Sequence, residues 1–253
     1  KDEANHQLYE FELLVKVYSG TDAHPRGGLM SQHLDAMNIC DSIQVAGPLG
    51  DHIYAPKSKN VLLIAGGTGI TPIYQIAKHV VGDNAKRDTD DQTKLTVLFL
   101  NKTVEDILLK DELENLLLSS LSTEEKEFED VTYTTVSPHS IKFLVTQNEG
   151  LDENAEKEKE CNERIECTRL NKELLLNVLT SSASNSTTNE DNVEKNDELS
   201  VDVWICGPPG MVLAADLMLH DLGINMNQRN LLGVRRPIKR KTIMEERDGV
   251  SAA

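Results

Sequence analysis

The sequence contains few cysteines and few aromatic residues. Its four cysteines stand at positions 40, 161, 167 and 206 of 253 residues, which is too few for a disulfide framework. Cys161 and Cys167 have no second pair of cysteines or histidines at the spacing of a zinc site, so we expect no metal site. Aromatic residues make up only 4% of the chain and charged residues 27%, which indicates a substantial solvated part. The cysteine content makes a reducing compartment the default expectation.

Long apolar runs and an excess of positive charge are also absent. No apolar run approaches the ~20 residues of a membrane-spanning helix, and no signal-peptide pattern opens the sequence. We expect a cytoplasmic protein that contacts a membrane only through an N-terminal segment outside this sequence. The 26 basic and 42 acidic residues give a net charge of −16, so the chain has no electrostatic reason to bind nucleic acid.

One polar segment, residues 148–200, carries about half of the excess negative charge, with 14 acidic and 6 basic residues. It is rich in Glu, Lys, Asn, Ser and Thr, and positions 181–189 are close to low complexity. Only residues 170–179 have enough apolar side chains for a helix. We therefore expect its flanks, 148–168 and 181–198, to form a disordered insertion without chemistry.

The most informative stretch lies at positions 61–72 and reads Val-Leu-Leu-Ile-Ala-Gly-Gly-Thr-Gly-Ile-Thr-Pro. Its apolar run predicts a strand buried on both faces, and the glycines predict a tight turn. Thr71 can cap a following helix and Pro72 fits its first turn, so the free amides would form an anion site. A third glycine is missing at position 72 and no Gly-Lys-Ser/Thr follows, which excludes the dinucleotide fingerprint and the P-loop. The alternative is a glycine-rich turn without a ligand.

An alternation of strands and helices surrounds this stretch. Strand patterns occur at 61–65, 95–100, 131–136 and 201–205, and helical patterns near 72–81, 104–118 and 211–222 separate them. Thr103 and Asp106 form a candidate capping box for the second helix. Its buried face would consist of Ile107, Leu108, Leu113, Leu116 and Leu117. The alternation predicts a parallel α/β sheet.

Two further turns are candidate binding elements. Residues 8–18 and 42–46 read as strands, and between them Gly27 and Gly28 precede a short predicted helix at 31–36, a geometry suited to an anion. Without other information this turn is an ordinary loop. Far downstream the strand 201–205 ends at Cys206 and continues as Gly-Pro-Pro-Gly-Met, where two prolines predict a rigid apolar ledge. Taken alone, Cys206 is a packing residue.

Three motifs occur in the order seen in the ferredoxin-reductase-like flavoenzymes: Gly-Gly-Leu-Met-Ser at 27–31, Gly-Gly-Thr-Gly-Ile-Thr-Pro at 66–72 and Cys-Gly-Pro-Pro-Gly-Met at 206–211. From about Phe11 to Leu232 the sequence resembles this family, and it is most similar to the NADH-cytochrome b5 reductases and the flavin domain of eukaryotic nitrate reductase. The resemblance implies a parallel nucleotide-binding sheet preceded by part of an antiparallel FAD-binding β-barrel. It also implies an NADH-dependent flavin oxidoreductase that passes electrons through FAD to a haem protein such as cytochrome b5.

The resemblance also implies roles for residues. Expected at the FAD pyrophosphate are Lys16, Tyr18, Gly27, Gly28, Met30 and Ser31. Expected at the phosphates of the nicotinamide nucleotide are Gly66, Gly67, Thr68 and Gly69. Thr71 and Pro72 would approach the flavin ring, and the nicotinamide would lie against Cys206, Gly207, Pro208, Pro209 and Met211. Thr71 and Cys206 are the expected catalytic residues.

The sequence departs from the family in several places. The Arg-x-Tyr-Ser/Thr motif of the flavin domain is missing, so we expect an incomplete FAD site in a partial barrel at 1–57. Residues 58–234 would form the NAD(P)-binding domain, and 235–253 a basic tail with no flavin-covering aromatic residue before it. Val136 or Ser137 stands where an acidic residue favours NADH, so NADPH is not excluded. Two alternatives stay open: the C-terminal reductase domain of a nitrate reductase, and a catalytically incomplete nucleotide-binding remnant.

Overall fold

The structure is a computed structural model and describes residues 11–22, 24–46, 53–55, 58–118, 138–147, 164–183 and 200–234. The chain divides into two compact units, Lys1–Tyr54 and Ala55–Ala253.

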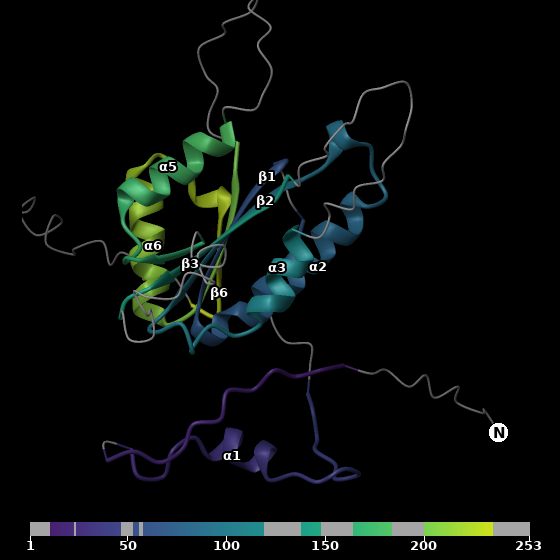
Figure 1. The fold of residues 1–253 in the computed structure, drawn as a ribbon, viewed down its shortest axis with the longest axis vertical. Helices are drawn as coiled ribbons and strands as arrows, with labels where there is room; N and C mark the ends of the chain where they lie inside the picture. Colours follow the sequence, from purple (N-terminus) through teal and green to yellow (C-terminus); the bar gives the residue numbers. More distant parts are fainter. Residues whose placement is uncertain are drawn as a thin grey trace, which may run out of the picture. The chain divides into compact units, whose positions relative to one another are not determined.

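The second unit is built on a six-stranded parallel sheet (Figure 1). Its strands are β1 (Asn60–Gly66), β2 (Lys94–Asn101), β3 (Ser140–Val145), β4 (Ile165–Cys167), β5 (Asp202–Cys206) and β6 (Arg229–Leu232). They lie in the order β4-β3-β2-β1-β5-β6, with every neighbouring pair parallel. The central strand β1 is buried from Val61 to Gly66, because it has neighbours on both sides and helices over both faces. The predicted parallel α/β sheet is confirmed.

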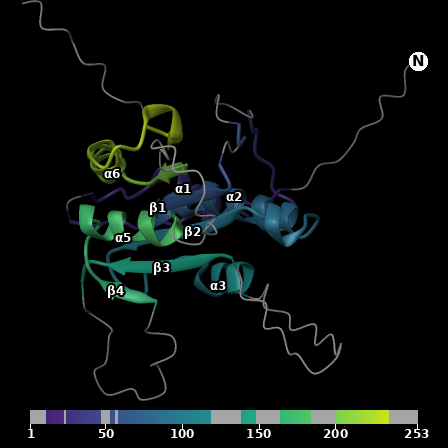
Figure 2. The same ribbon diagram turned by 90° about the horizontal axis from the view of Figure 1, so that it is seen from above.

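Helices cover both faces of this sheet. They are α2 (Ile70–Asn84), α3 (Lys110–Leu118), α5 (Lys172–Ala183) and α6 (Pro209–Asp221), with short 3-10 turns at Gly67–Gly69, Thr89–Asp91 and Met226–Gln228. Helices α5 and α6 pack on one face and α2 and α3 lie on the other (Figure 1). Leu62, Ile64 and Leu98 face α5 and α6 in a continuous apolar core. Figure 2 shows β3 and β4 toward one side of the unit and α6 toward the opposite side.

The predicted strands at 61–65, 95–100 and 201–205 are confirmed as β1, β2 and β5. The predicted strand at 131–136, together with Val136 and Ser137, lies outside the described residues. The sheet contains two strands that the pattern did not predict, β3 and β4. Lys142 in the middle of β3 obscures its apolar alternation, and in the fold its ammonium donates to the Glu166 carboxylate of β4 at 2.5 Å.

The predicted helices are confirmed with corrected boundaries. Helix α2 begins at Ile70 with Gly69 as its N-cap, so Thr71 is not the cap, while Pro72 lies in the first turn. Helix α3 begins only at Lys110, because Leu109 takes a left-handed φ of 54° that a continuous helix cannot contain. The predicted capping box of Thr103 and Asp106 is therefore wrong. Of its predicted apolar face, Ile107, Leu113 and Leu117 are buried.

The polar segment at 148–200 is more structured than expected. Residues 165–167 form β4 and 172–183 form α5, so the expected disorder is wrong for 164–168 and 181–183. Strand β4 gains order from pairing with β3, which supplies backbone hydrogen bonds that sequence composition does not reveal. The rest of this segment and the basic tail at 235–253 lie outside the described residues.

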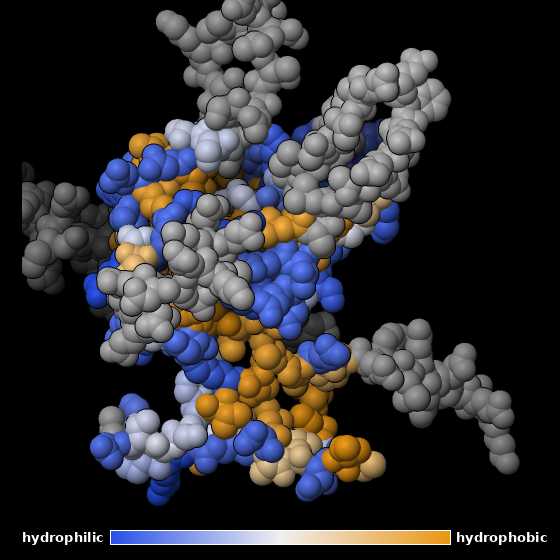
Figure 3. Space-filling model, in the orientation of Figure 1, coloured by the Kyte–Doolittle hydropathy of each residue, from blue (hydrophilic) through white to orange (hydrophobic). Residues whose placement is uncertain are grey.

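The first unit contains one described helix, α1 (Leu29–Asp35), which confirms the short helix predicted at 31–36. The predicted strands are wrong where they can be assessed, since 11–18 and 42–46 are extended but form no β-ladder within the described part. Strands need partners to satisfy their backbone groups, and none of the described segments here supplies one. Apolar side chains such as Phe11, 64% exposed, and Ile39, 97% exposed, remain at the surface. Figure 3 shows hydrophobic residues on the surface of the described part of the chain. No helix among the described residues has both the length and the hydropathy to cross a membrane.

Candidate functional site

The candidate site of the second unit lies where β1 and β5 end. These strands are neighbours, and Ala65 pairs with Cys206. From β1 the chain crosses toward β2, whereas β5 and β6 continue the sheet on the other side. The strand order therefore reverses between β1 and β5. Open α/β sheets bind ligands at the carboxyl ends of the strands beside such a reversal.

The two motifs that follow these strands pack directly against each other. A Cβ added at Gly69 would lie 2.4 Å from the carbonyl oxygen of Cys206, and one at Gly66 would lie 2.4 Å from the Met211 sulfur. Both distances are far below van der Waals contact. Gly69 is therefore needed for the close approach of the two backbones, whereas a side chain at Gly66 would require the flexible Met211 side chain to shift.

Gly67 differs from its neighbours because it faces open space. Its φ is +52°, in the left-handed region that favours glycine, and an added Cβ would meet no atom within 4 Å. Thr68 beside it is exposed, and the Thr71 hydroxyl donates to the Thr68 carbonyl at 3.3 Å. The turn thus offers backbone to an uncovered space at the start of α2. This cradle fits the phosphate of a nucleotide.

The second motif forms the predicted ledge. Gly207 lies beside Gly66, since a Cβ at Gly207 would be 3.0 Å from the Gly66 Cα. Pro208 and Pro209 are exposed, and α6 begins at Pro209 without a side-chain cap. Met211 is half-buried between the ledge and the apolar core. A flat aromatic ring has an apolar and inflexible surface to lie on here.

Cys206 is half-buried at the junction of the two motifs. Burial raises the pKa of its thiol above the ordinary value, and a backbone hydrogen bond at Gly207 opposes this only in part. Because the pKa is raised, the group is a neutral S–H at physiological pH. It is suited to contact with a neutral ring and is not activated as a nucleophile.

The helix after the ledge is held by a buried ion pair that sequence reasoning did not single out. The guanidinium of Arg229 in β6 donates from Nη1 to the Asp216 carboxylate of α6 at 2.6 Å, and its Nε donates to the Asn225 carbonyl at 3.3 Å. Both side chains are almost fully buried. The pair ties α6, and with it the ledge, to the edge of the sheet.

A second candidate site occupies the first unit, around α1. Ser31 accepts a hydrogen bond from the Tyr18 amide at 3.1 Å and donates to the Gly28 carbonyl at 3.0 Å. Gly27 has a φ of +58°, and a Cβ there would lie 2.4 Å from the Tyr18 carbonyl oxygen. The structure therefore brings Tyr18, Gly27, Gly28 and Ser31 together. Lys16 and Met30 are exposed beside them.

Gln32 completes this turn, although the sequence analysis did not select it. Its amide nitrogen donates to the carbonyls of Tyr18 at 3.0 Å and Arg26 at 2.9 Å, and so joins the extended segment to the glycine turn. Its place directly after the Gly-Gly-Leu-Met-Ser motif was the available signal. The tight backbone turn fits the pyrophosphate of a dinucleotide such as FAD.

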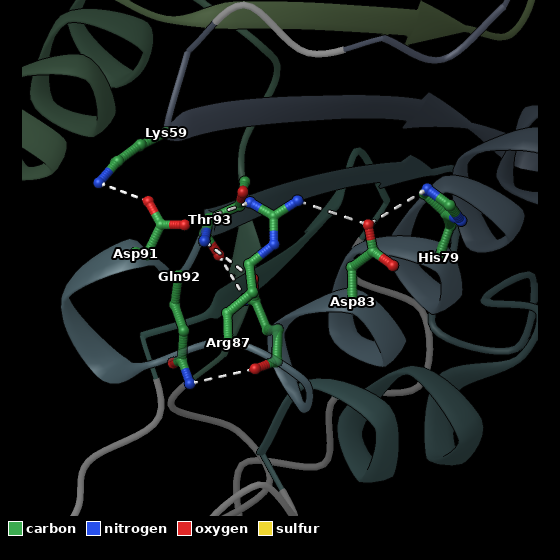
Figure 4. Close-up of polar contacts among 8 residues, drawn as sticks. Lys59, His79, Asp83, Arg87, Asp91, Gln92 and Thr93 are labelled. Carbon is green, nitrogen blue, oxygen red and sulfur yellow. Dashed lines mark hydrogen bonds and ion pairs between the residues drawn. The ribbon is translucent and has the colours of Figure 1, made fainter.

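The opposite end of the sheet, where the strands begin, carries a different set of polar groups. His139 accepts from the Leu95 amide at 3.2 Å, and burial lowers its pKa to about 4. On the nearby surface Asp83 lies between Arg87 and His79, and Asp91 pairs with Lys59 at 2.9 Å (Figure 4). These groups are bonded to one another and form no cradle. The described residues also contain no cluster of three or more His, Cys, Asp or Glu able to hold a metal ion.

Comparison with known proteins identifies two domain families in the chain. Residues 3–54 match the oxidoreductase FAD-binding domain family, and residues 63–142 match the oxidoreductase NAD-binding domain family. Two similar curated proteins are nitrate reductase [NADH] of Spinacia oleracea, 42% identical over 118 residues, and nitrate reductase [NADH] 1 of Arabidopsis thaliana, 44% identical over 117 residues. Each match covers 41% of this chain and only 12% of the relative's length.

Solved structures show the same fold. The cytochrome b5 reductase domain of Ulva prolifera nitrate reductase aligns with a TM-score of 0.54 and 23% identity, covering 86% of this chain and 71% of that one. The CS-b5R domains of human Ncb5or in the NAD+ form give a TM-score of 0.51 and 24% identity, covering 81% of this chain and 45% of that one. The two domain families indicate FAD and NADH as cofactors. The chain thus contains a match to an FAD-binding oxidoreductase domain followed by a match to an NAD-binding oxidoreductase domain, and it shares its fold with cytochrome b5 reductase domains.

Proposed function

We propose that the protein is an NADH-dependent flavin oxidoreductase that passes electrons through FAD to a haem protein such as cytochrome b5. The observation that carries the proposal is the packing of two glycine motifs at the carboxyl ends of β1 and β5, with an open phosphate cradle on one side and a proline ledge on the other. When bound, NADH supplies a hydride and FAD converts it into single electrons. That the electron acceptor is a haem protein is part of the proposal.

The residues of the second unit bind and orient the nicotinamide nucleotide. The backbone of Gly66, Gly67, Thr68 and Gly69 receives its phosphates. Pro208 and Pro209 would support the nicotinamide ring, with Gly207 allowing a close approach and Met211 packed beside the ledge. Cys206 presents a neutral thiol to the reacting face. Thr71 and Pro72, in the first turn of α2, would border the flavin ring.

The first unit holds the FAD. Gly27, Gly28 and Ser31 surround the pyrophosphate, with Lys16, Tyr18 and Met30 beside it. In this assignment residues 1–57 belong to the FAD-binding barrel, 58–234 to the NAD(P)-binding domain with its polar insertion at about 148–200, and 235–253 to a basic tail.

A second candidate function is supported by the relatives. The two curated relatives given above are named nitrate reductases, and the match covers 12% of each. The chain would then be the reductase part of such a protein, with its electrons delivered to a haem domain of the same polypeptide. A haem or molybdenum domain in the upstream coding sequence would favour this function, and a barrel alone would favour the free reductase.

Nucleotide and flavin binding test the proposal directly. The chain should quench or shift NADH fluorescence on titration, retain added FAD in its absorbance spectrum, and oxidise NADH with ferricyanide or cytochrome b5. Replacing Gly67 by Val should abolish NADH binding, because a β-branched side chain would enter the open cradle. Gly223→Val is the matched control, since Gly223 also has a positive φ of 86° and open space around it but lies after α6.

The outcomes separate the hypotheses. NADH binding with no flavin retention and no NADH oxidation would identify the catalytically incomplete remnant. If Gly67→Val and Gly223→Val weaken NADH binding equally, the cradle is not the binding site.

A further inference from the structure

A buried amide without partners lies beneath the phosphate cradle. Asn101 is the last residue of β2 and is 7% exposed. Among the described residues neither its Oδ1 nor its Nδ2 has a hydrogen-bond partner. Buried polar groups in native proteins are nearly always paired, and an unpaired one destabilises the state that contains it. The free protein therefore tolerates an unfavourable group at this position.

Asn84 shows how this protein treats a buried amide of purely structural use. It ends α2 at the opposite edge of the sheet and is 5% exposed. Its Nδ2 donates to the Thr93 carbonyl at 2.8 Å, and its Oδ1 accepts from the Thr93 amide at 2.9 Å. Asn84 and Asn101 are thus similarly buried, but only the Asn84 amide has hydrogen-bond partners among the described residues. Asn101 lies at the carboxyl ends of the strands, where the candidate site is.

The location of Asn101 connects it to the glycine turn. Leu100 pairs with Gly66, so Asn101 is level with Gly67, the first residue of the turn. Side chains alternate along a strand, and Leu98 faces α5 and α6, which places Asn101 on the α2 face. Its backbone is held in the sheet, because Asn101 pairs with Val145 of β3 and its carbonyl accepts from the Thr146 amide at 3.3 Å. A new bond therefore forms more easily by a movement of the turn than by a movement of the strand.

The outer part of the turn, at Gly67 and Thr68, is open, whereas Gly69 packs against the Cys206 backbone. Its local bonds include the 3-10 contact from the Ile70 amide to the Gly67 carbonyl and the bond from the Thr71 hydroxyl to the Thr68 carbonyl at 3.3 Å. Gly67 has no side chain and nothing within 4 Å of its Cβ position. Because glycine tolerates backbone conformations closed to other residues, the peptide planes beside Gly67 can rotate more readily than those at Gly69.

We propose that Asn101 is a positioning residue for nucleotide binding, whose amide forms hydrogen bonds with the backbone of Gly67–Gly69 only when the turn holds a phosphate. This inference rests on the proposed function. The unsatisfied amide raises the free energy of the free form and is relieved in the bound form. A ligand shifts an equilibrium by its differential affinity for the two forms, so the amide strengthens nucleotide binding at the expense of stability.

Asn101→Leu tests this, because leucine has nearly the shape of asparagine but no hydrogen-bonding groups. The melting temperature of the free variant should equal or exceed that of the parent, while its Kd for NADH should rise roughly tenfold, the loss expected for a neutral hydrogen bond near the upper end of its range. Asn84→Leu is the matched control. It should melt at a lower temperature and keep the parent's Kd, since its amide is bonded in both forms.

A second measurement uses the unsubstituted chain. The side-chain amide resonances of Asn101 should shift and become protected from hydrogen exchange when NADH is added, while those of Asn84 stay unchanged. An unchanged Kd in Asn101→Leu, a lower melting temperature of that free variant, or unchanged Asn101 resonances would each overturn the role of Asn101, as expected if a trapped water satisfies the amide in both forms. Failure of the unsubstituted chain to bind NADH would overturn the proposed function as well.

Discussion

Buried polar groups are bonded differently at the amino edge of the parallel sheet, where the strands begin, and at its carboxyl edge, where they end. At the amino edge Asn84, Thr93 and His139 bond to one another and to the backbone. At the carboxyl edge Asn101 has no partner among the described residues, Gly67 takes a left-handed conformation, and Cys206 is a half-buried thiol. The side chains named at the amino edge are hydrogen-bonded within the protein, whereas the Asn101 amide at the carboxyl edge makes no hydrogen bond among the described residues.

This difference separates the end of the sheet that contributes to stability from the end that carries the candidate site. A saturated polar network favours a single arrangement, whereas unsatisfied groups and unusual backbone conformations raise the energy of the free protein and are typical of functional sites. The surrounding apolar layers on both faces of β1 supply the stability that such an edge requires. Substitutions at the two edges should therefore have different consequences, and the following experiments test that expectation.

The largest effect is expected from Gly69→Ala. The new Cβ would lie 2.4 Å from the carbonyl oxygen of Cys206, and both elements are backbone that cannot easily move apart. Overpacking of this severity should lower the free energy of unfolding by about 3 kcal/mol. Urea denaturation followed by circular dichroism measures it. Gly82→Ala is the control, because Gly82 lies within α2 with nothing near its Cβ position, and it should stabilise the chain by about 0.5–1 kcal/mol. Equal effects of the two substitutions would contradict the packing of the two motifs.

A pH effect should be specific to the amino edge. The folded pKa of His139 is lowered to about 4 by burial, from 6.5 in the unfolded chain. Its contribution to stability is thus fully present above pH 6.5 and is lost as the pH falls from 6.5 toward 4, where the unfolded state binds the additional proton. The loss should be about 2 kcal/mol.

The comparison of two histidine variants isolates this effect. His139→Gln should flatten the dependence of stability on pH between 4 and 6.5, and His79→Gln, at a side chain that is 59% exposed, is the surface control. Thermal melts across this pH range provide the measurement. The idea fails if the His139 variant retains the slope of the parent chain.

A coupling is expected across the carboxyl edge between Gly66 and Met211. Gly66→Ala would place a Cβ 2.4 Å from the Met211 sulfur, and Met211→Ala would remove that sulfur. The double variant should be more stable than the sum of the single effects predicts, by about 1 kcal/mol, with the contact to Pro208 at 3.0 Å limiting the recovery. A double-mutant cycle from denaturation curves measures the coupling. Strict additivity would show that Met211 does not lie over Gly66.

The smallest effect is expected from the surface ion pairs. Lys59 and Asp91 are both more than half exposed, and Lys59 lowers the pKa of Asp91 through a hydrogen bond and its charge. Water and salt screen such a pair, so Lys59→Ala should not change the melting temperature measurably. A clear decrease that persists at high salt would assign these charges a structural role.

Several features of this protein followed from the sequence alone. The apolar run at 61–65 and the alternation of strands and helices after it determined a parallel sheet, because burial on both faces requires continuous apolar residues. The glycine and proline motifs located both turns, since these residues restrict or free the backbone wherever they stand. The family resemblance then led to the prediction of FAD and NADH as cofactors, which the two matching domain families support.

Other features were decided by tertiary contacts. Strand β4 exists because β3 offers it backbone hydrogen bonds, and Lys142 enters β3 because Glu166 neutralises it. The expected strands at 11–18 and 42–46 are extended but unpaired in the described part, because a strand pattern cannot supply its own neighbour. Local sequence also could not show that Gly69 must be a glycine because Cys206 lies against it, or that the Asn84 amide has partners while the Asn101 amide has none among the described residues. These properties depend on which distant residues the fold brings within hydrogen-bonding or van der Waals distance, and a sequence read position by position does not contain that information.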